Sequence, residues 1–176
     1  MKVKFWGTRG SVPTPISPGA IEDKIRQALR GAAGFDLSSE EAVEHCLQRL
    51  PASVRYTIGG NTACVEVRAG GQLLILDAGS GLRLLGNKLN KSKFGKGQGV
   101  VDFLISHTHW DHIQGLPFFG PGFVEGNRLI FHSPHPHLES AFVGQQNEIY
   151  FPVPLSYLRA DIQFRHISAQ VWTEIG

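Results

Sequence analysis

The chain has 176 residues, of which 41% are hydrophobic, and its 17 basic and 15 acidic residues leave a formal net charge of +2. This length predicts one domain with a sizeable core, and the charges are too evenly balanced to indicate a nucleic-acid partner on that ground alone. We find neither an N-terminal apolar signal segment nor a run of about 18 apolar residues, so we expect no membrane span and a cytoplasmic protein.

The N-terminal part of the sequence predicts one strand followed by two helices. A strand over residues 2–7 leads into a loop rich in proline and glycine. Apolar residues on one face indicate a helix over 19–31. A second helix is expected over 39–50, and Ser38 and Glu41 form a capping-box pattern at its start.

The middle of the sequence predicts a β-hairpin, a helix and a buried strand. The hairpin strands cover 62–68 and 72–77, and the Gly70-Gly71 pair between them is typical of a tight turn. Leucines recur on one face of a helix over 81–89. The apolar run 100–105, rich in β-branched and aromatic residues, predicts a buried strand.

The last part predicts alternating short elements. They are a short helix from Asp111 towards Leu116, a strand over 128–132, a helix over 137–149, and two strands over 161–167 and 169–173. Two cysteines, Cys46 and Cys64, lie in contexts typical of buried free thiols rather than of a disulfide.

The segment His107-Thr108-His109-Trp110-Asp111-His112 follows the predicted buried strand directly and holds four good metal ligands. In an extended or tightly turned loop, His107 and His109 point the same way and can reach one ion. Asp111 and His112 begin the next element, and ligands that diverge in this way serve two ions better than one. Imidazole and carboxylate ligands suit zinc, manganese or iron.

Together with three other stretches, this motif resembles the signature of the metallo-β-lactamase-fold hydrolases. The stretches are residues 2–11, 59–67 and 74–83, and their combination is most similar to the phosphodiesterase and ribonuclease Z-like branch. The resemblance implies an α/β fold, the αββα metallo-β-lactamase-like sandwich. We expect residues 1–176 to form a single domain that covers about the first half to two-thirds of this sandwich, with 19–51 as a helical insertion.

The resemblance also implies a metal-dependent hydrolase of phosphodiester bonds, acting on a small phosphodiester or RNA. Two divalent metals, with zinc favoured over manganese or iron, would share a hydroxide that attacks the substrate. His107 and His109 would hold the first ion and Asp111 and His112 the second, while Asp111 would also orient the water and take its proton.

Three further ligands, a His, a bridging Asp and a last His, are expected from a segment beyond Gly176. The alternative is a non-catalytic or assembly-dependent metal-binding protein with a half-built site, or a lactone or thioester hydrolase once completed. Self-association or a missing C-terminal segment is therefore expected, and the role of the 19–51 insertion stays open between a hairpin packed on the sheet edge, which we favour, and a lid or dimer surface.

Asp77 is expected to support the metal site rather than to bind an ion. A carboxylate at the end of a buried strand needs hydrogen bonds, and the backbone N–H groups of residues 78–81 are its nearest donors. In the family that the chain resembles, the corresponding Asp also holds the ligand loop. The resemblance places Arg9 and Asn61 at the substrate rim, where Arg9 binds either a phosphate or a structural ion-pair partner.

Other residues near the motif have alternative roles. For Trp110, packing beneath the ligand loop is favoured over stacking on a substrate. His132, His135 and His137 form a second histidine cluster, for which lining the substrate cleft is favoured over binding metal, and His135 is the member assigned to the possible rim.

Overall fold

A computed structural model describes residues 1–57, 59–168 and 170–175 of the chain. The chain divides into two compact units, one formed by Met1–Pro13 with Asn61–Gly176 and the other by Thr14–Gly60. Among the described residues, no helix is long and apolar enough to cross a membrane.

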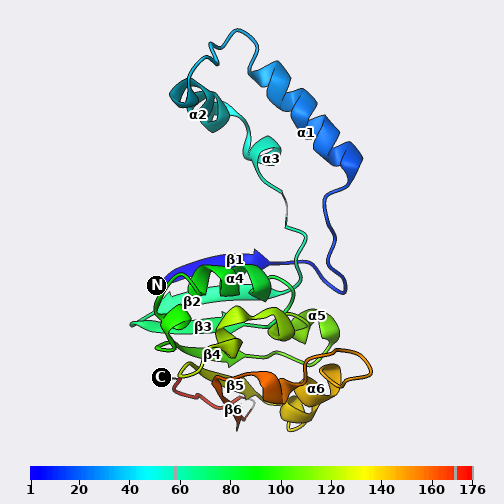
Figure 1. Cartoon of the computed structure of the whole chain (residues 1–176), viewed down its shortest axis with the longest axis vertical. Coiled ribbons are helices and arrows are strands. Elements are labelled where there is room, and N and C mark those ends of the chain that lie inside the picture. The colour runs from blue at the N-terminus through cyan, green and yellow to red at the C-terminus, as the bar shows by residue number, and fades with distance from the viewer. Residues whose placement is uncertain (58, 169, 176) are drawn as a thin grey trace. The chain divides into compact units, whose positions relative to one another are not determined.

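The first unit is built on a mixed sheet that has six strands over the described residues, in the order β1-β2-β3-β4-β5-β6 (Figure 1). The strands are β1 (Lys2–Gly7), β2 (Cys64–Ala69), β3 (Gln72–Leu76), β4 (Val100–Leu104), β5 (Arg128–Ser133) and β6 (Asp161–His166). The first three strands pair antiparallel, and β3 to β6 pair parallel. The predicted hairpin is confirmed, and both Gly70 and Gly71 in its turn have positive φ angles of 55° and 83°, which glycine adopts without strain.

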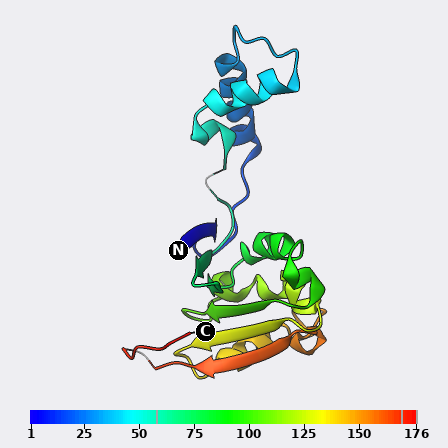
Figure 2. The ribbon, with the colours of Figure 1, turned by 90° about the vertical axis from the view of Figure 1, so that its left-hand side faces the viewer.

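The helices of this unit follow the parallel strands. They are α4 (Leu82–Leu89), α5 (Trp110–Ile113) and α6 (Leu138–Gln145), with short 3-10 turns η1 (Lys93–Lys96), η2 (Leu116–Phe118), η3 (Gly120–Phe123) and η4 (Leu155–Tyr157). From β3 to β6, each strand lies next to the strand that precedes it in the sequence, always on the same side. Right-handed crossovers between them therefore place α4, α5 and α6 on the same face, as Figure 2 shows.

The core lies between this sheet face and the helices. Phe103 of β4 and Phe131 of β5 stack with ring centroids 4.5 Å apart, and Leu82 and Leu85 of α4 are fully buried with them. Side chains alternate across a strand, so Asp102 and His132 point to the opposite face of the same two strands.

The second unit is helical and contains α1 (Pro18–Gly31), α2 (Glu40–Arg49) and α3 (Ala52–Arg55). The Oγ of Ser39 accepts the Ala42 N–H at 3.2 Å and caps α2. The predicted capping box of Ser38 and Glu41 was wrong: the helix begins one residue later, its N3 residue Ala42 has no side-chain acceptor, and the Ser38 N–H donates to the Asp36 carboxylate at 3.0 Å. The status of this unit as an insertion stays a prediction.

Two predictions in the C-terminal part were wrong. The helix predicted over 137–149 ends at Gln145, because the Asn147 side chain accepts the Ile149 N–H and forms a turn that competes with the helix. The strand predicted over 169–173 is absent from residues 170–173, and residue 169 lies outside the described residues. Cys46 and Cys64 are free and buried, as expected.

Candidate functional site

The predicted site residues gather at the carboxyl ends of three neighbouring parallel strands. Asp77 follows β3, the segment from Ser106 to His112 follows β4, and His135 follows β5. Parallel strands end at one edge of the sheet, where loops from separate parts of the chain meet. The fold therefore brings together side chains that lie up to about sixty residues apart in the sequence.

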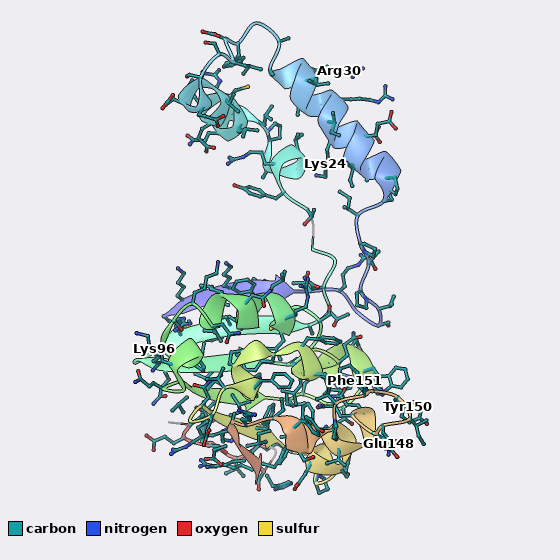
Figure 3. The ribbon with its side chains drawn as sticks, viewed as in Figure 1. Lys24, Arg30, Lys96, Glu148, Tyr150 and Phe151 are labelled. Carbon is teal, nitrogen blue, oxygen red and sulfur yellow. The ribbon has the colours of Figure 1, made fainter. Side chains whose placement is uncertain are left out.

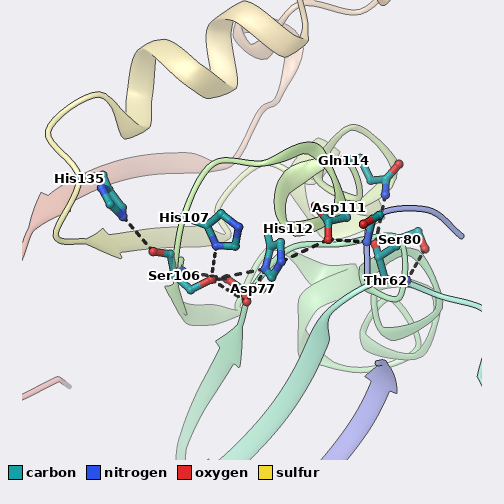
Figure 4. A network of polar contacts seen from close by, with 10 residues as sticks. Thr62, Asp77, Ser80, Ser106, His107, Asp111, His112, Gln114 and His135 are labelled. Atoms are coloured by element: carbon teal, nitrogen blue, oxygen red, sulfur yellow. Dashed lines mark hydrogen bonds and ion pairs between the residues drawn. The ribbon is translucent and has the colours of Figure 1, made fainter. Parts of the chain in front are cut away.

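Asp77 holds the ligand loop through both of its carboxylate oxygens. It accepts the Ser106 N–H at 2.8 Å and contacts the Ser106 Oγ at 2.9 and 3.0 Å, and its Oδ2 lies 2.8 Å from Nδ1 of His112 (Figure 4). Its φ of 58° is in the left-handed region, which Asp tolerates better than most residues. The expected bonds to the N–H groups of residues 78–81 were wrong. The Ala78 N–H donates to the His112 carbonyl at 2.7 Å, and the three N–H groups that follow donate to Ala63 and Thr62.

The imidazole rings of the motif lie against one another. The centroid of His107 is 4.6 Å from that of His109 and 4.0 Å from that of His112. Beside them, Oδ2 of Asp111 is 3.3 Å from Nε2 of His112 and accepts the Ser11 N–H at 2.8 Å. The four proposed ligands are thus brought to one small region.

The protonation states of His107 and Asp111 suit metal binding. Burial, together with the His112 and His109 rings, lowers the pKa of His107, which keeps it neutral at pH 7 with a lone pair available. Burial raises the pKa of Asp111, but the Ser11 N–H and His112 outweigh it, so its pKa lies below the usual value and the carboxylate is ionised.

The donor atoms fit an ion in part. Two ligands at about 2.1 Å from a tetrahedral zinc lie about 3.4 Å apart, close to the 3.3 Å between Oδ2 of Asp111 and Nε2 of His112. The second nitrogen of His112 is fixed by a carboxylate, as is usual for metal-binding histidines. However, no group of three or more His, Cys, Asp or Glu side chains among the described residues is arranged to hold an ion.

Close backbone packing holds α5 beside the Asp77 loop. A Cβ on Gly79 would lie 2.3 Å from the carbonyl oxygen of Asp111, and one on Gly115 would lie 2.0 Å from that of Gly79. The glycines therefore let the two loops approach. Gln114 strengthens the junction by donating from Nε2 to Oγ1 of Thr62 at 3.1 Å, and the same hydroxyl accepts the Ser80 N–H at 2.8 Å.

Ser11 and Ser106 are the contributors that sequence reasoning missed. Ser106 stands at the end of a buried strand, a position from which its contact with Asp77 could have been expected. Ser11 gave no signal, because its role depends on a backbone φ of 63° that aims its N–H at Asp111.

The three residues proposed for the substrate rim, Arg9, Asn61 and His135, differ in exposure and in their hydrogen-bond partners. Arg9 is exposed, and its backbone N–H donates to the Asn61 carbonyl at 3.0 Å. Asn61 is partly buried and its Oδ1 accepts the Ser80 hydroxyl at 3.1 Å, so this side chain supports the loop. His135 lies beside the motif, with Nε2 3.0 Å from the Ser106 carbonyl oxygen.

The predicted histidine cluster is only partly formed. The rings of His135 and His137 are 5.5 Å apart, and Nε2 of His137 is 3.3 Å from Oγ1 of Thr108. His132 is buried elsewhere, where its Nε2 lies 2.8 Å from Oδ1 of Asp102. His132 therefore does not join the other two histidines, because the period of the strand turns its side chain to the opposite face of the sheet.

Trp110 also differs from expectation. Its side chain is 73% exposed, so it does not pack beneath the ligand loop. It begins α5, whose four residues place only Ile113 in the core.

Comparison with known proteins gives a family and a solved structure. The profile of the family described as the Metallo-beta-lactamase superfamily matches residues 57–159, more than half of the chain. A crystal structure of human tRNase Z, short form, is similar with 18% sequence identity and a TM-score of 0.45, over 96% of this chain and 45% of that chain. This chain thus spans less than half the length of that protein. No curated protein matches the chain.

Proposed function

We propose that this chain, which belongs to the metallo-beta-lactamase superfamily, contributes the HxHxDH half of a metal-dependent hydrolase that cleaves phosphodiester bonds. The observation that carries the proposal is the Asp77–His112–Asp111 arrangement. One nitrogen of His112 is 2.8 Å from the Asp77 carboxylate, and the other is 3.3 Å from the Asp111 carboxylate, the separation expected of two ligands on one ion.

In this proposal, His107 and His109 hold one divalent ion and Asp111 and His112 hold a second, with zinc favoured over manganese or iron. When bound, such ions supply a nucleophile at neutral pH and neutralise charge that develops on the phosphoryl oxygens. The chain's own residues position the reaction. An ionised Asp111 carboxylate takes a proton from the attacking water, while Asp77 fixes the His112 ring and Ser11 fixes the Asp111 side chain.

Arg9 is proposed to contact the substrate phosphate. It is exposed and stands two residues before Ser11, whose N–H reaches Asp111. A guanidinium matches the oxygens of a phosphate with its fork of donors. We keep a cytoplasmic location and a small phosphodiester or RNA substrate as parts of the same proposal.

A second candidate is a metal-binding protein that turns over substrate only in an assembly or as part of a longer protein. The observation in its favour is the ligand count, because the motif offers two side chains to each ion and catalytic zinc sites use three protein ligands with a water. Among the described residues, no three His, Cys, Asp or Glu side chains are arranged to hold one ion.

A hydrolysis assay tests the proposal. The complete protein that contains this chain is given a model aryl phosphodiester with zinc or manganese, beside its His109→Ala and Asp111→Ala variants and a His45→Ala control on the helical unit. We expect metal-dependent turnover in the parent and the control, and background rates in the two site variants. Equal turnover in all four proteins would remove these residues from the reaction. Zinc binding without turnover in the parent would favour the second candidate.

A further inference from the structure

A pocket of about 540 Å³ opens beside the ligand loop, and four of the residues that line it are aromatic. Its walls include Trp110, Phe118, Tyr150 and Phe151, with the amide side chains of Gln114 and Gln145. We call it the aromatic pocket. Its size falls in the range of small-molecule sites, which span about 300–1,000 Å³.

The rings are exposed although the unit has a well-filled core. Trp110, Phe118 and Tyr150 are 73%, 53% and 75% exposed. Large apolar side chains that gather at a concave surface indicate a binding site more than isolated ones do. Figure 3 labels Tyr150 and Phe151 on the segment after α6, which faces α5 across the pocket.

The walls are held in place before any ligand arrives. Phe118 and Phe151 meet edge to face, with centroids 5.5 Å apart and planes at 84°. The N–H groups of Tyr150 and Phe151 both donate to the Asn147 carbonyl at 2.8 Å, which fixes the turn that carries them. Gln145 donates from Nε2 to the Ile113 carbonyl at 3.1 Å and ties α6 to α5.

The ligand loop itself forms one wall. Its residues alternate, so that His107, His109 and Asp111 belong to the candidate metal site, whereas Thr108 and Trp110 line the pocket. A molecule with one end at the metal site therefore has the aromatic pocket within immediate reach. None of the described residues that line the pocket carries a charge, which suits a neutral group and leaves a phosphate to the metal site.

We infer that the aromatic pocket binds the planar aromatic ring, a nucleobase or an aryl group, of a phosphodiester whose phosphoryl group lies at the His107–His112 loop. This inference rests on the proposed function. Stacking on exposed aromatic side chains accepts any flat ring. The amides of Gln114 and Gln145 have fixed orientations, because the nitrogen of each already donates to a protein oxygen, and they can bond the polar edge of a nucleobase.

The test measures binding without metal and without turnover. Saturation-transfer NMR on the whole chain compares adenosine 5′-monophosphate, phenyl phosphate and ribose 5-phosphate. We expect the two ring-bearing ligands to bind and ribose 5-phosphate to give no signal. Trp110→Ala and Tyr150→Ala should weaken ring binding about tenfold or more, whereas Tyr157→Ala, which removes an exposed ring outside the pocket, should leave it unchanged.

The two ring-bearing ligands separate the possible sources of the ring. Tighter binding of adenosine 5′-monophosphate than of phenyl phosphate assigns the pocket to nucleobases, and equal binding assigns it to aryl groups. Ring binding that is equal in parent, Trp110→Ala and Tyr150→Ala overturns the inference, as does equal binding of ribose 5-phosphate. A Trp110 indole signal that shifts with protein concentration alone also overturns it, since a second copy would then fill the pocket.

The outcome for the pocket is separable from that for the proposed function. Metal-dependent hydrolysis that survives in Trp110→Ala and Tyr150→Ala, with no ring bound to the parent, refutes the pocket and keeps the hydrolase. Ring binding with no metal-dependent hydrolysis refutes the hydrolase.

Discussion

Asp77 is the residue that links the sheet to the candidate metal site. It follows β3 with a left-handed backbone conformation, and its carboxylate contacts Ser106 and His112, the first and last residues of the segment that carries the ligands. Outer carboxylates of this kind fix the tautomer and the orientation of a ligating imidazole. Without Asp77, the His112 ring would be free to turn Nε2 away from Asp111.

We predict that Asp77→Asn lowers zinc affinity about 10- to 100-fold while the fold is kept. Asparagine adopts positive φ about as readily as aspartate, so the backbone is retained, but an amide cannot accept through both of its terminal atoms. A competition titration against a chromogenic chelator measures the affinity. Asp161→Asn, at an exposed ion pair with Arg128, is the control. Equal zinc affinity in parent and Asp77→Asn would show that Asp77 does not support an ion.

The positions and partners of residues near the motif could be predicted from the sequence only where neighbouring residues determine them. The position of His107, His109, Asp111 and His112 at the end of a buried strand could be predicted, since strand and motif are contiguous. The partners of His132 and Trp110 could not. His132 pairs with Asp102 thirty residues away in sequence, and Trp110 is exposed because the first turn of α5 buries only Ile113.

At the scale of elements, Glu66 clamps three segments together. This buried carboxylate of β2 accepts Trp6 Nε1 of β1 at 2.8 Å and Arg68 Nε at 2.6 Å, and Lys88 of α4 lies 3.6 Å away. Burial raises its pKa, but the hydrogen bonds from Arg68 and Trp6 and the nearby cations outweigh burial and leave the pKa below its usual value. The ionised form is therefore the one that the folded state prefers.

We predict that Glu66→Gln destabilises the protein by about 1.5–3 kcal/mol at pH 7, the range for hydrogen bonds to charged groups. Because the folded-state pKa is depressed, this stabilisation is present above the unfolded value of about 4.3 and is lost as pH falls through the folded pKa. Urea unfolding at a series of pH values should show that the free energies of unfolding of the parent and the variant become equal in acid. An exposed Glu125→Gln control should match the parent throughout, and a gap that persists unchanged in acid would contradict the assignment.

The elements themselves could largely be predicted, whereas their ends could not. Period-two runs and the leucines of α4 reflect burial against a core, which is a local signal in the sequence. Helix ends depend on single side chains that compete for backbone N–H groups. Ser39 rather than Ser38 caps α2, and the Asn147 turn stops α6.

At the scale of the whole molecule, α4, α5 and α6 lie on one face of the sheet of the first unit, and none of the described helices of this unit covers the other face. Val3, Phe5 and Leu76 on this face are 46%, 66% and 38% exposed. They share the face with Leu74, which pairs in register with Asp102 of the next strand. Apolar side chains on an open sheet face favour association with another surface. We keep self-association, or cover by a further segment, as the proposal that follows.

We predict that the 176-residue chain associates and binds zinc weakly by itself. Light scattering should give a mass above the 19.3 kDa of one chain, and Phe5→Glu should shift it towards one chain, because the charge would be buried on association. Val143→Glu, on the helix-covered side and 53% exposed, should leave the mass unchanged. Calorimetric zinc titration should show weak binding, since the motif gives each ion two ligands. A monodisperse monomer with two tightly bound zinc ions would refute this prediction.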